Sequence, residues 1–358
     1  MKTQIETALG DDEANWDALQ AGRSGLSKQA IEGFAEPWTM CRLADLSAPP
    51  GTFAGLQTLL ARLLAGVPSL PTRTALLCAT TKGAVDELLA SPAGAWPGQP
   101  FELAAIIARQ LGINHEQHTV SAACASGTVA IMEAVMRLTR EECEAALVVG
   151  VDLVSRFVLA GFASLQALAP DGCRPFDAAR DGLSLGEGGG WLLLTTAEQA
   201  AARQWPVMAE IAGYGISCDA THITAPCRQA SGLIRALQQA TAHGSLPVGG
   251  VNAHGTGTIY NDAMEILAFT RVWQQPPPAH SVKGAIGHCL GAAGVIEAAL
   301  AIRSLQAGVL PPTVGLREAE SVQVPLSGSE PLPLRHPSVL SCNSGFGGIN
   351  AAILFACP

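Results

Sequence analysis

Short apolar runs alternate along the chain with segments in which apolar residues recur every three or four positions. The runs predict buried strands, and the recurring segments predict amphipathic helices. The predicted strands are residues 74–80, 144–152, 189–196, 207–217, 248–255, 337–344 and 350–356. The predicted helices are residues 53–66, 101–111, 124–140, 228–243, 262–273 and 291–307. Strands this apolar belong to sheets covered on both faces, so the pattern predicts an α/β fold.

The same pattern divides the chain into two halves. Each half runs strand, helix, strand and ends in an apolar strand. Residues 197–206 are predicted to be a hinge, which gives halves of residues 1–197 and 198–358. The Gly- and Asp-rich residues 160–188 are predicted to be a connection within the first half.

Composition narrows the class of protein. Hydrophobic residues make up 48% of the chain and charged residues 14%, which is typical of a well-buried globular enzyme. The 21 basic and 30 acidic side chains give a net charge of −9, which argues against nucleic acid or an anionic membrane as the main partner. The N-terminus has no apolar signal region, and no run of about 18 apolar residues occurs.

The ten cysteines form no CxxC pair, and their spacing matches no zinc signature. This predicts a reduced, cytoplasmic protein without a metal site, in which most cysteines are small core residues.

One cysteine has a different setting. Cys124 lies in VSAACASGTVAI, residues 120–131, among small residues and at the start of a predicted helix. Unpaired N–H groups and the helix dipole at such a start lower the pKa of a thiol and favour the nucleophilic thiolate. The small neighbours leave room for an incoming carbonyl group. On this segment alone, a buried structural cysteine is the alternative.

A histidine follows a predicted strand in VNAHGTGTIYNDAMEI, residues 251–266. His254 stands there beside a Gly-rich loop, and strand-end loops often carry catalytic groups. Asp262 and Glu265 come near the start of the next helix, where acids suit the dipole, so they are predicted to be caps or supports. For His254 alone, a structural role and a catalytic role are equally open.

Three ionisable residues share the apolar segment SVKGAIGHCLGAAGVIEAAL, residues 281–300. They are Lys283, His288 and Glu297. Unpaired buried charge is costly, so the sequence predicts an ion pair between Lys283 and Glu297. A neutral His288 is then free to donate a hydrogen bond into a cavity.

The last segment of interest is SCNSGFGGIN, residues 341–350. Its glycines around Phe346 predict a tight turn between two strands. A backbone N–H in this turn offers half of an oxyanion hole, and a plain Gly-rich hairpin is the alternative. Together the segments supply a nucleophile, two imidazoles, an ion pair and a donor loop, which fits thioester chemistry.

With these segments together, the chain resembles a β-ketoacyl-acyl carrier protein synthase, the condensing enzyme of fatty-acid and type II polyketide synthesis. The motifs that carry the resemblance follow the family's order over about residues 115–358, and they are AACASG, RPFDAARDGLSLGEGGG, NAHGTGT, VKGAIGHCLGAAG, GVLPPT and GFGGINAA. The resemblance implies a thiolase-like, five-layered αβαβα sandwich of two duplicated halves. It also implies a dimer that works with acyl- and malonyl-loaded acyl carrier protein and needs no metal or organic cofactor.

The resemblance also implies a role for each residue. Cys124 would carry the acyl group, while His254 and His288 would polarise the malonyl thioester and support decarboxylation. Lys283 and Glu297 would hold the electrostatics of the site. Phe346 would gate the acyl pocket, and its N–H would form the oxyanion hole with that of Cys124.

The chain departs from the family in several ways. It is predicted to begin without the full first strand, and residues 30–70 are short. Ser344 stands where members often have a second Phe. Only four lysines occur, so a docking site for an acidic carrier protein must rely on Arg. The segment ATTKGAVDELL, residues 79–89, resembles condensing enzymes of aryl-polyene and flexirubin pigment clusters.

Two other functions stay open. A chain-length-factor-like partner subunit shapes the pocket of a heterodimer without turning over; the short N-terminal region favours this, and the intact Cys124 opposes it. A thiolase that acts on coenzyme A thioesters uses a second cysteine near its C-terminal Gly-rich loop. Cys342 stands near that loop here, but the pair of histidines is the pattern of the condensing enzymes.

Overall fold

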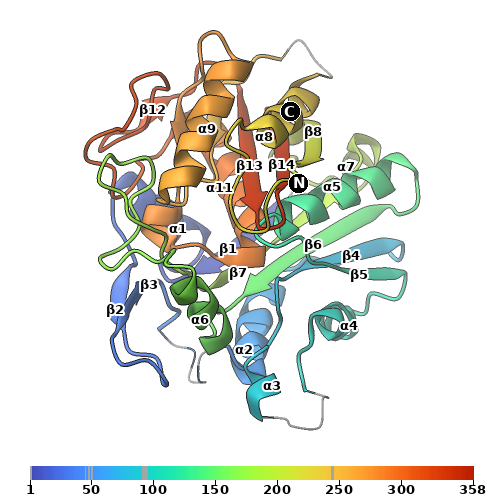
Figure 1. Cartoon of the computed structure of the whole chain (residues 1–358). Helices are drawn as coiled ribbons and strands as arrows, with labels where there is room; N and C mark the ends of the chain where they lie inside the picture. The colour runs from blue at the N-terminus through green and yellow to red at the C-terminus, as the bar shows by residue number, and fades with distance from the viewer. Residues whose placement is uncertain (1, 45, 47–48, 50, 91–95, 243–245) are drawn as a thin grey trace.

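Two five-stranded mixed sheets organise the chain (Figure 1). The structure is a computed structural model that describes residues 2–44, 46, 49, 51–90, 96–242 and 246–358. The first sheet has the order β1-β7-β6-β4-β5. Its strands are β1 (Lys2–Thr7), β4 (Thr74–Ala79), β5 (Glu116–Val120), β6 (Ala145–Asp152) and β7 (Gly188–Thr195).

The second sheet repeats this design with later residues. Its order is β10-β9-β13-β14-β8. Its strands are β8 (Glu210–Cys218), β9 (Gly250–Asn252), β10 (Ala279–His280), β13 (Ser338–Gly345) and β14 (Ile349–Ala356). In both sheets the first strand of the half pairs antiparallel with the last, and the last pairs antiparallel with the one before it. The remaining two pairings are parallel, so the two sheets share one topology.

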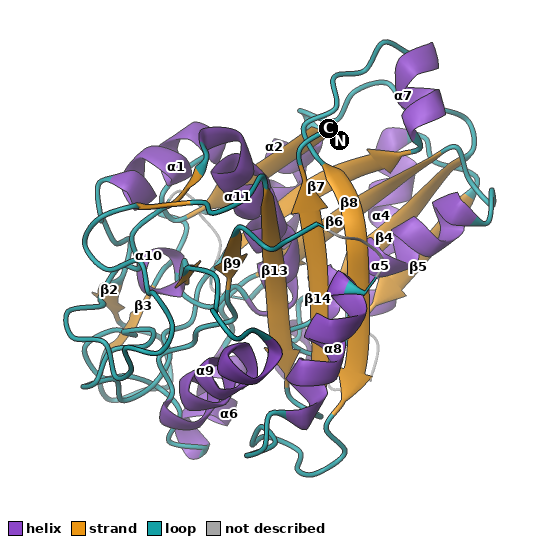
Figure 2. Cartoon of the chain, turned by 90° about the horizontal axis from the view of Figure 1, so that it is seen from above, coloured by secondary structure: helices purple, strands orange, loops and turns teal. Residues whose placement is uncertain are grey.

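Helices form three layers around the two sheets. The inner helices α5 (Ser126–Thr139) and α11 (Ala293–Ala307) contact each other and both sheets. On the outer face of the first sheet lie α2 (Phe53–Leu64) and α4 (Pro100–Leu111), which share a core with Leu76, Leu147 and Trp191. On the outer side of the second sheet lie α8 (Ser231–Thr241), packed across β8 and β14, and α9 (Ile259–Val272) (Figure 2). The result is the five-layered αβαβα arrangement, which confirms the predicted fold class.

Shorter elements complete the fold. The helices are α1 (Asp12–Gln20), α3 (Glu87–Ala90), α6 (Arg156–Ser164), α7 (Ala197–Ala202), α10 (Lys283–Ile286) and the 3₁₀ turn η1 (Leu290–Ala292). The remaining strands are β2 (Ser27–Gln29), β3 (Trp38–Met40), β11 (Val309–Leu310) and β12 (Leu332–Pro333).

The inner helix α11 fixes the position of the site because it lies between the sheets. With η1 it spans Leu290–Ala307, 18 residues that are long and apolar enough to cross a membrane, yet 83% of this stretch is buried inside the protein. It is therefore the core helix of the sandwich. Small residues let it approach α5 closely: a Cβ on Gly294 would lie 2.4 Å from the backbone nitrogen of Thr128.

The predicted strands and helices of the sandwich are confirmed, with ends that shift by a few residues. Several predictions need correction. The first strand is present: β1 pairs with β7 over its full length. The predicted hinge 197–206 begins with helix α7, and the connection 160–188 begins inside helix α6. Residue 243 at the predicted end of α8, and residues 45, 47, 48 and 50 of the short segment, lie outside the described residues.

Candidate active site

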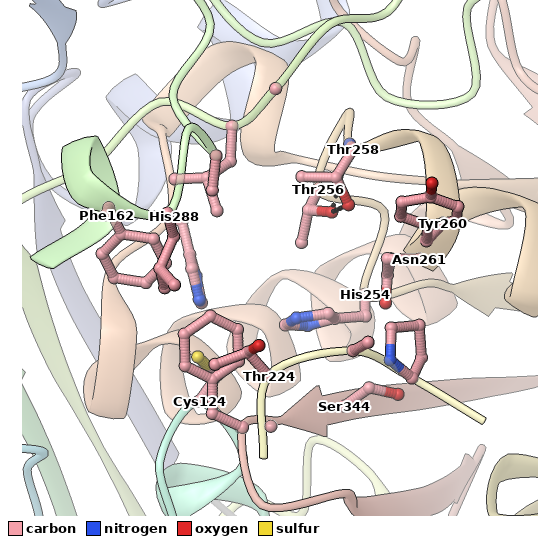
Figure 3. Close-up of a pocket in the computed structure, with 18 of the residues that line it drawn as sticks. Cys124, Phe162, Thr224, His254, Thr256, Thr258, Tyr260, Asn261, His288 and Ser344 are labelled. Carbon is pink, nitrogen blue, oxygen red and sulfur yellow. Dashed lines mark hydrogen bonds between the residues drawn. The ribbon is translucent and has the colours of Figure 1, made fainter. Parts of the chain in front are cut away.

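One cavity gathers the residues that the sequence singled out from segments far apart along the chain. It has a volume of about 360 Å³, and Cys124, His254 and His288 line it together. Figure 3 shows the side chains of Cys124, His254 and His288 pointing toward one another. Cys124 comes from the first sheet's half of the sandwich, and both histidines come from the second.

The nucleophile candidate sits on a tight backbone turn. Cys124 lies between β5 and α5, and the helix itself begins at Ser126, two residues later than predicted. Ala123 has a φ of 48°, a left-handed conformation that costs a residue with a Cβ about 1–2 kcal/mol. The Ser126 hydroxyl stabilises the turn because it accepts from the Ala122 N–H at 2.8 Å and donates to the Ala123 carbonyl at 2.6 Å.

The predicted low pKa of the Cys124 thiol is wrong. Burial raises the pKa to about 11, and the Lys283 ammonium and the Phe346 N–H offset only part of that rise. Only 7% of the residue is exposed. Desolvation of the thiolate therefore outweighs the helix start, and the Cys124 side chain is a neutral thiol.

The loop that presents His254 is held by two buried carboxyl groups. Glu265 accepts from the N–H groups of His254 and Gly255, each at 2.7 Å. Asp262 accepts from the Thr256 N–H at 3.0 Å. The prediction that these acids support the loop is confirmed, since each carboxyl group receives the otherwise unpaired N–H groups at the end of β9.

The predicted ion pair lies directly behind His254. Lys283 Nζ is 2.5 Å from Glu297 Oε1, and both side chains are 1% exposed. Lys283 Nζ is also 3.3 Å from His254 Nδ1, and Asn343 Nδ2 is 3.2 Å from the same nitrogen. An ammonium and an amide N–H only donate, so Nδ1 accepts and the proton of the neutral ring is on Nε2.

Both imidazoles are neutral. The pKa of His254 lies well below its ordinary value because the ring is buried and because Lys283 and His288 are near. Burial and Lys283 lower the pKa of His288 in the same way. Neither ring nitrogen of His288 has a hydrogen-bond partner in the described part of the chain, so both are available to a bound substrate. The two rings meet edge to face, with centroids 5.3 Å apart.

The predicted tight turn joins β13 to β14. Gly347 and Gly348 have φ angles of 86° and 79°, which glycine adopts without strain. The Phe346 N–H lies near enough to the Cys124 thiol to lower its pKa. The Phe346 ring packs against Phe162 of α6, with ring centroids 5.4 Å apart. Cys342 is not among the described residues that line the cavity: it lies in the core outside the second sheet with Phe269, and its thiol is 3.8 Å from Glu265 Oε1.

Sequence reasoning missed four features of the site. Asn343 lies in the segment of residues 341–350, yet a single amide gives no signal of its own. Phe162 belongs to helix α6, where the sequence predicts a connection. Thr256 and Thr258, whose hydroxyls line the cavity (Figure 3), belong to a motif read mainly for its histidine. A second buried ion pair joins Lys82 Nζ to Asp152 Oδ1 at 3.0 Å. Its only signal in the sequence is a single lysine in an otherwise uncharged stretch.

Comparisons with known proteins show the family of the chain. A family model described as "Beta-ketoacyl synthase, N-terminal domain" matches residues 73–200, and one described as "Beta-ketoacyl synthase, C-terminal domain" matches residues 208–317. The first match ends after β7 and the second begins just before β8. The first includes Cys124, and the second includes His254, Lys283, His288 and Glu297.

Individual relatives share a large part of the chain. It is 35% identical to nodulation protein E of Rhizobium meliloti over 264 residues, 72% of this chain and 65% of that protein. It is 35% identical to 3-oxoacyl-(acyl-carrier-protein) synthase 2 of Rhizobium meliloti (strain 1021) over 279 residues, again 72% and 65%. The match thus spans just under two thirds of these relatives. A solved structure titled "The ishigamide ketosynthase/chain length factor" superposes with a TM-score of 0.87 and 30% identity, covering 99% of this chain and 98% of that chain.

Proposed function

The chain belongs to the β-ketoacyl synthase family, and on this premise we propose that it is a 3-oxoacyl-acyl carrier protein synthase. It would condense an acyl thioester with malonyl-acyl carrier protein, with loss of carbon dioxide, in fatty-acid or polyketide synthesis. One observation carries the proposal: a buried thiol, two neutral imidazoles and a backbone N–H converge on one cavity. The resemblance to the pigment-cluster branch stays a prediction.

The first half of the reaction loads Cys124. Its sulfur attacks the carbonyl carbon of the acyl thioester as the thiol loses its proton. The N–H groups of Cys124 and Phe346 stabilise the oxyanion that forms. The bond to the carrier thiol then breaks, that thiol leaves with the proton, and an acyl-Cys124 thioester remains. A thiol with a pKa of about 11 is protected from side reactions until the substrate arrives.

The second half uses the imidazoles. The malonyl thioester oxygen accepts from His254 Nε2–H and from the ring N–H of His288. The bond to the malonyl carboxylate breaks, carbon dioxide leaves, and the electron pair becomes an enolate that these donors stabilise. The enolate carbon attacks the acyl-Cys124 carbonyl, the β-ketoacyl product leaves, and the Cys124 thiolate takes a proton from solvent. No step needs a metal or an organic cofactor.

The setting of the reaction is part of the proposal. The half made of residues 1–197 would supply the nucleophile, and the half made of residues 198–358 would supply the two histidines. The chain would act in the cytoplasm as a homodimer or as a heterodimer with another ketosynthase-like subunit. The acidic carrier protein would dock mainly on arginines, since Lys283 and Lys82 are buried and Lys28 is paired with Asp171.

A second function has one observation in its favour. The solved structure at 30% identity is titled as a ketosynthase/chain length factor. The alternative proposal is therefore that this chain is a pocket-shaping partner of a ketosynthase. Against it stand the intact Cys124 and the fully paired Lys283–Glu297 network. A thiolase function is less well supported, because it needs a second cysteine in the site. Cys342 is not among the described residues that line the cavity.

Intact-protein mass spectrometry separates these functions. The purified chain is incubated with acyl-carrier protein and then with malonyl-carrier protein. We expect an acyl adduct on Cys124 that converts to an elongated β-keto product. Cys124→Ala should abolish the adduct, while Cys342→Ala is the matched control that retains it. An adduct that forms equally in Cys124→Ala would refute the nucleophile, and elongation only after a second subunit is added would favour the partner role.

A further inference from the structure

A single buried amide connects the nucleophile's helix to the catalytic charges. Asn343 lies on β13 and is fully buried. Its Oδ1 accepts from Thr128 Oγ1 at 2.5 Å. Its Nδ2 donates to Glu297 Oε2 at 2.6 Å and faces His254 Nδ1 at 3.2 Å. Both atoms of the amide that can form hydrogen bonds are therefore occupied by groups in or next to the site.

Glu297 decides which way this amide points. Burial raises the pKa of Glu297, but the Lys283 ammonium, 2.5 Å away, opposes that rise and keeps Glu297 a carboxylate, which can only accept. If the amide were flipped, its oxygen would lie against the Glu297 oxygen, and two acceptors would repel each other at that distance. The amide nitrogen must therefore face Glu297, and its second hydrogen then faces His254 Nδ1.

Asn343 adds a second hydrogen-bond donor to His254 Nδ1, which Lys283 alone reaches only at a longer distance. Lys283 Nζ also contacts the His254 carbonyl oxygen and Glu297, each at 2.5 Å, so its three hydrogens serve three acceptors and Nδ1 is the most distant, at 3.3 Å. The amide of Asn343 is a second donor to the same ring nitrogen from another strand. With donors on two sides, Nδ1 keeps its lone pair and Nε2 keeps the proton.

The other end of the amide reaches the nucleophile. Thr128 lies in the first turn of α5, four residues after Cys124. Its hydroxyl holds the Asn343 oxygen, so the α5 turn next to Cys124 and the His254 ring are separated by a single side chain. Gly294 leaves the space for this contact, since a Cβ there would lie 2.4 Å from Thr128 Oγ1.

We propose that Asn343 is a positioning residue for condensation: oriented by Glu297 and anchored by Thr128, it holds His254 with its reactive proton on Nε2, aimed at the malonyl thioester. This role rests on the proposed function and deepens it. It is specific to the second half of the reaction, because loading of Cys124 uses backbone N–H groups and not the His254 ring.

The substitution Asn343→Asp tests the role because it keeps the shape and replaces a donor with an acceptor. The new carboxylate oxygen lies between Glu297 Oε2 and His254 Nδ1, which are both acceptors, so the added negative charge draws a proton onto Nδ1 and raises the pKa of His254. The Nε2–H then survives only while the ring is doubly protonated, so condensation should persist at low pH and fall as pH rises. The expected loss at pH 8 is about 10²- to 10⁴-fold, the range a positioned acid–base group contributes. Wild type should show no such fall, since its His254 stays neutral.

Acylation and condensation are measured separately from pH 6 to pH 9, by intact mass and by release of carbon dioxide from malonyl-carrier protein. Acylation of Asn343→Asp should stay within about twofold of wild type, because His254 takes no part in it. Asn252→Asp is the matched control. Asn252 is buried in the same sheet and donates to the Glu297 backbone carbonyl at 3.0 Å, but it does not contact the His254 ring. It should lose thermal stability without gaining the pH dependence.

A second pair of variants covers a failure of Asn343→Asp to fold. Thr128→Val leaves the Asn343 oxygen buried without a donor and should slow condensation by about tenfold while sparing acylation. Thr128→Ser keeps the hydroxyl and should restore condensation. Parallel losses of both half-reactions, or a wild-type pH profile in Asn343→Asp, would overturn the positioning role alone. A wild-type chain that loads Cys124 but never condenses would overturn the proposed function, and the positioning role with it.

Discussion

The protonation state of the Cys124 thiol gives the most direct quantitative prediction. Burial raises the pKa of Cys124 to about 11, with Lys283 and the Phe346 N–H opposing the rise. At pH 8 a thiol of that pKa is about 0.1% thiolate, whereas a free cysteine with a pKa of about 8.5 is about a quarter thiolate. Because iodoacetamide reacts with thiolates, Cys124 should alkylate about two hundredfold more slowly than free cysteine at pH 8.

The assay follows alkylation of each cysteine by peptide mapping between pH 7 and pH 11, since exposed thiols such as Cys218 also react. The rate at Cys124 should rise about tenfold per pH unit and begin to level off only near pH 11. Lys283→Met removes a charge that lowers the pKa, so it should displace the curve to still higher pH. A plateau at or below pH 8 would refute the reasoning, because it would mean that the helix start dominates over burial.

Three further variants test the packing and the chemistry. His288→Ala should leave the acyl adduct intact by mass and reduce condensation by about 10²- to 10⁴-fold, since only the enolate step uses its ring. Gly294→Ala places a Cβ 2.4 Å from Thr128 and should lower the free energy of unfolding by about 1–3 kcal/mol in urea titrations, whereas Gly161→Ala, which meets nothing within 4 Å, should not destabilise. Lys82→Met removes the cation paired with the buried Asp152 carboxylate, which keeps its hydrogen bonds to Thr80, Thr81 and Gly291, and should lower the free energy of unfolding by about 1–3 kcal/mol in the same titration. A change under about 1 kcal/mol would contradict the pairing.

The interior of the sandwich could be predicted from the sequence because its strands are apolar on both faces. β6 and β7 are almost wholly buried, so every position carries the signal. β5 and β1 were missed for the opposite reason. β5 reads EQHTV at the edge of the sheet, and β1 has only Ile5 as an apolar residue, so neither shows a hydrophobic pattern. Their place is set by hydrogen bonds to neighbouring strands, which leave no mark on residue type.

Some features of the candidate site could likewise be predicted from the sequence, and others could not. The pairing of Lys283 with Glu297 could be predicted because burying either charge alone is costly. The pKa of Cys124 could not, because the sequence shows where a helix starts but not how much water reaches it. Asn343 went unnoticed because a neutral amide is cheap to place, and its importance depends on Thr128, a residue 215 positions away.

The cost of the buried charges bears on the choice between a synthase and a pocket-shaping partner. Lys283–Glu297 and Lys82–Asp152 are both almost fully buried, and ion pairs of this kind are often less stabilising than apolar residues of the same volume. A subunit that only shapes a pocket needs volume and apolar lining, which uncharged side chains supply at lower cost. Lys283 and Glu297 instead hold a network that sets the tautomer of His254 beside an intact Cys124. A buried ion pair that costs stability but fixes the proton on His254 Nε2 is expected in a chain that catalyses a reaction. This favours the synthase.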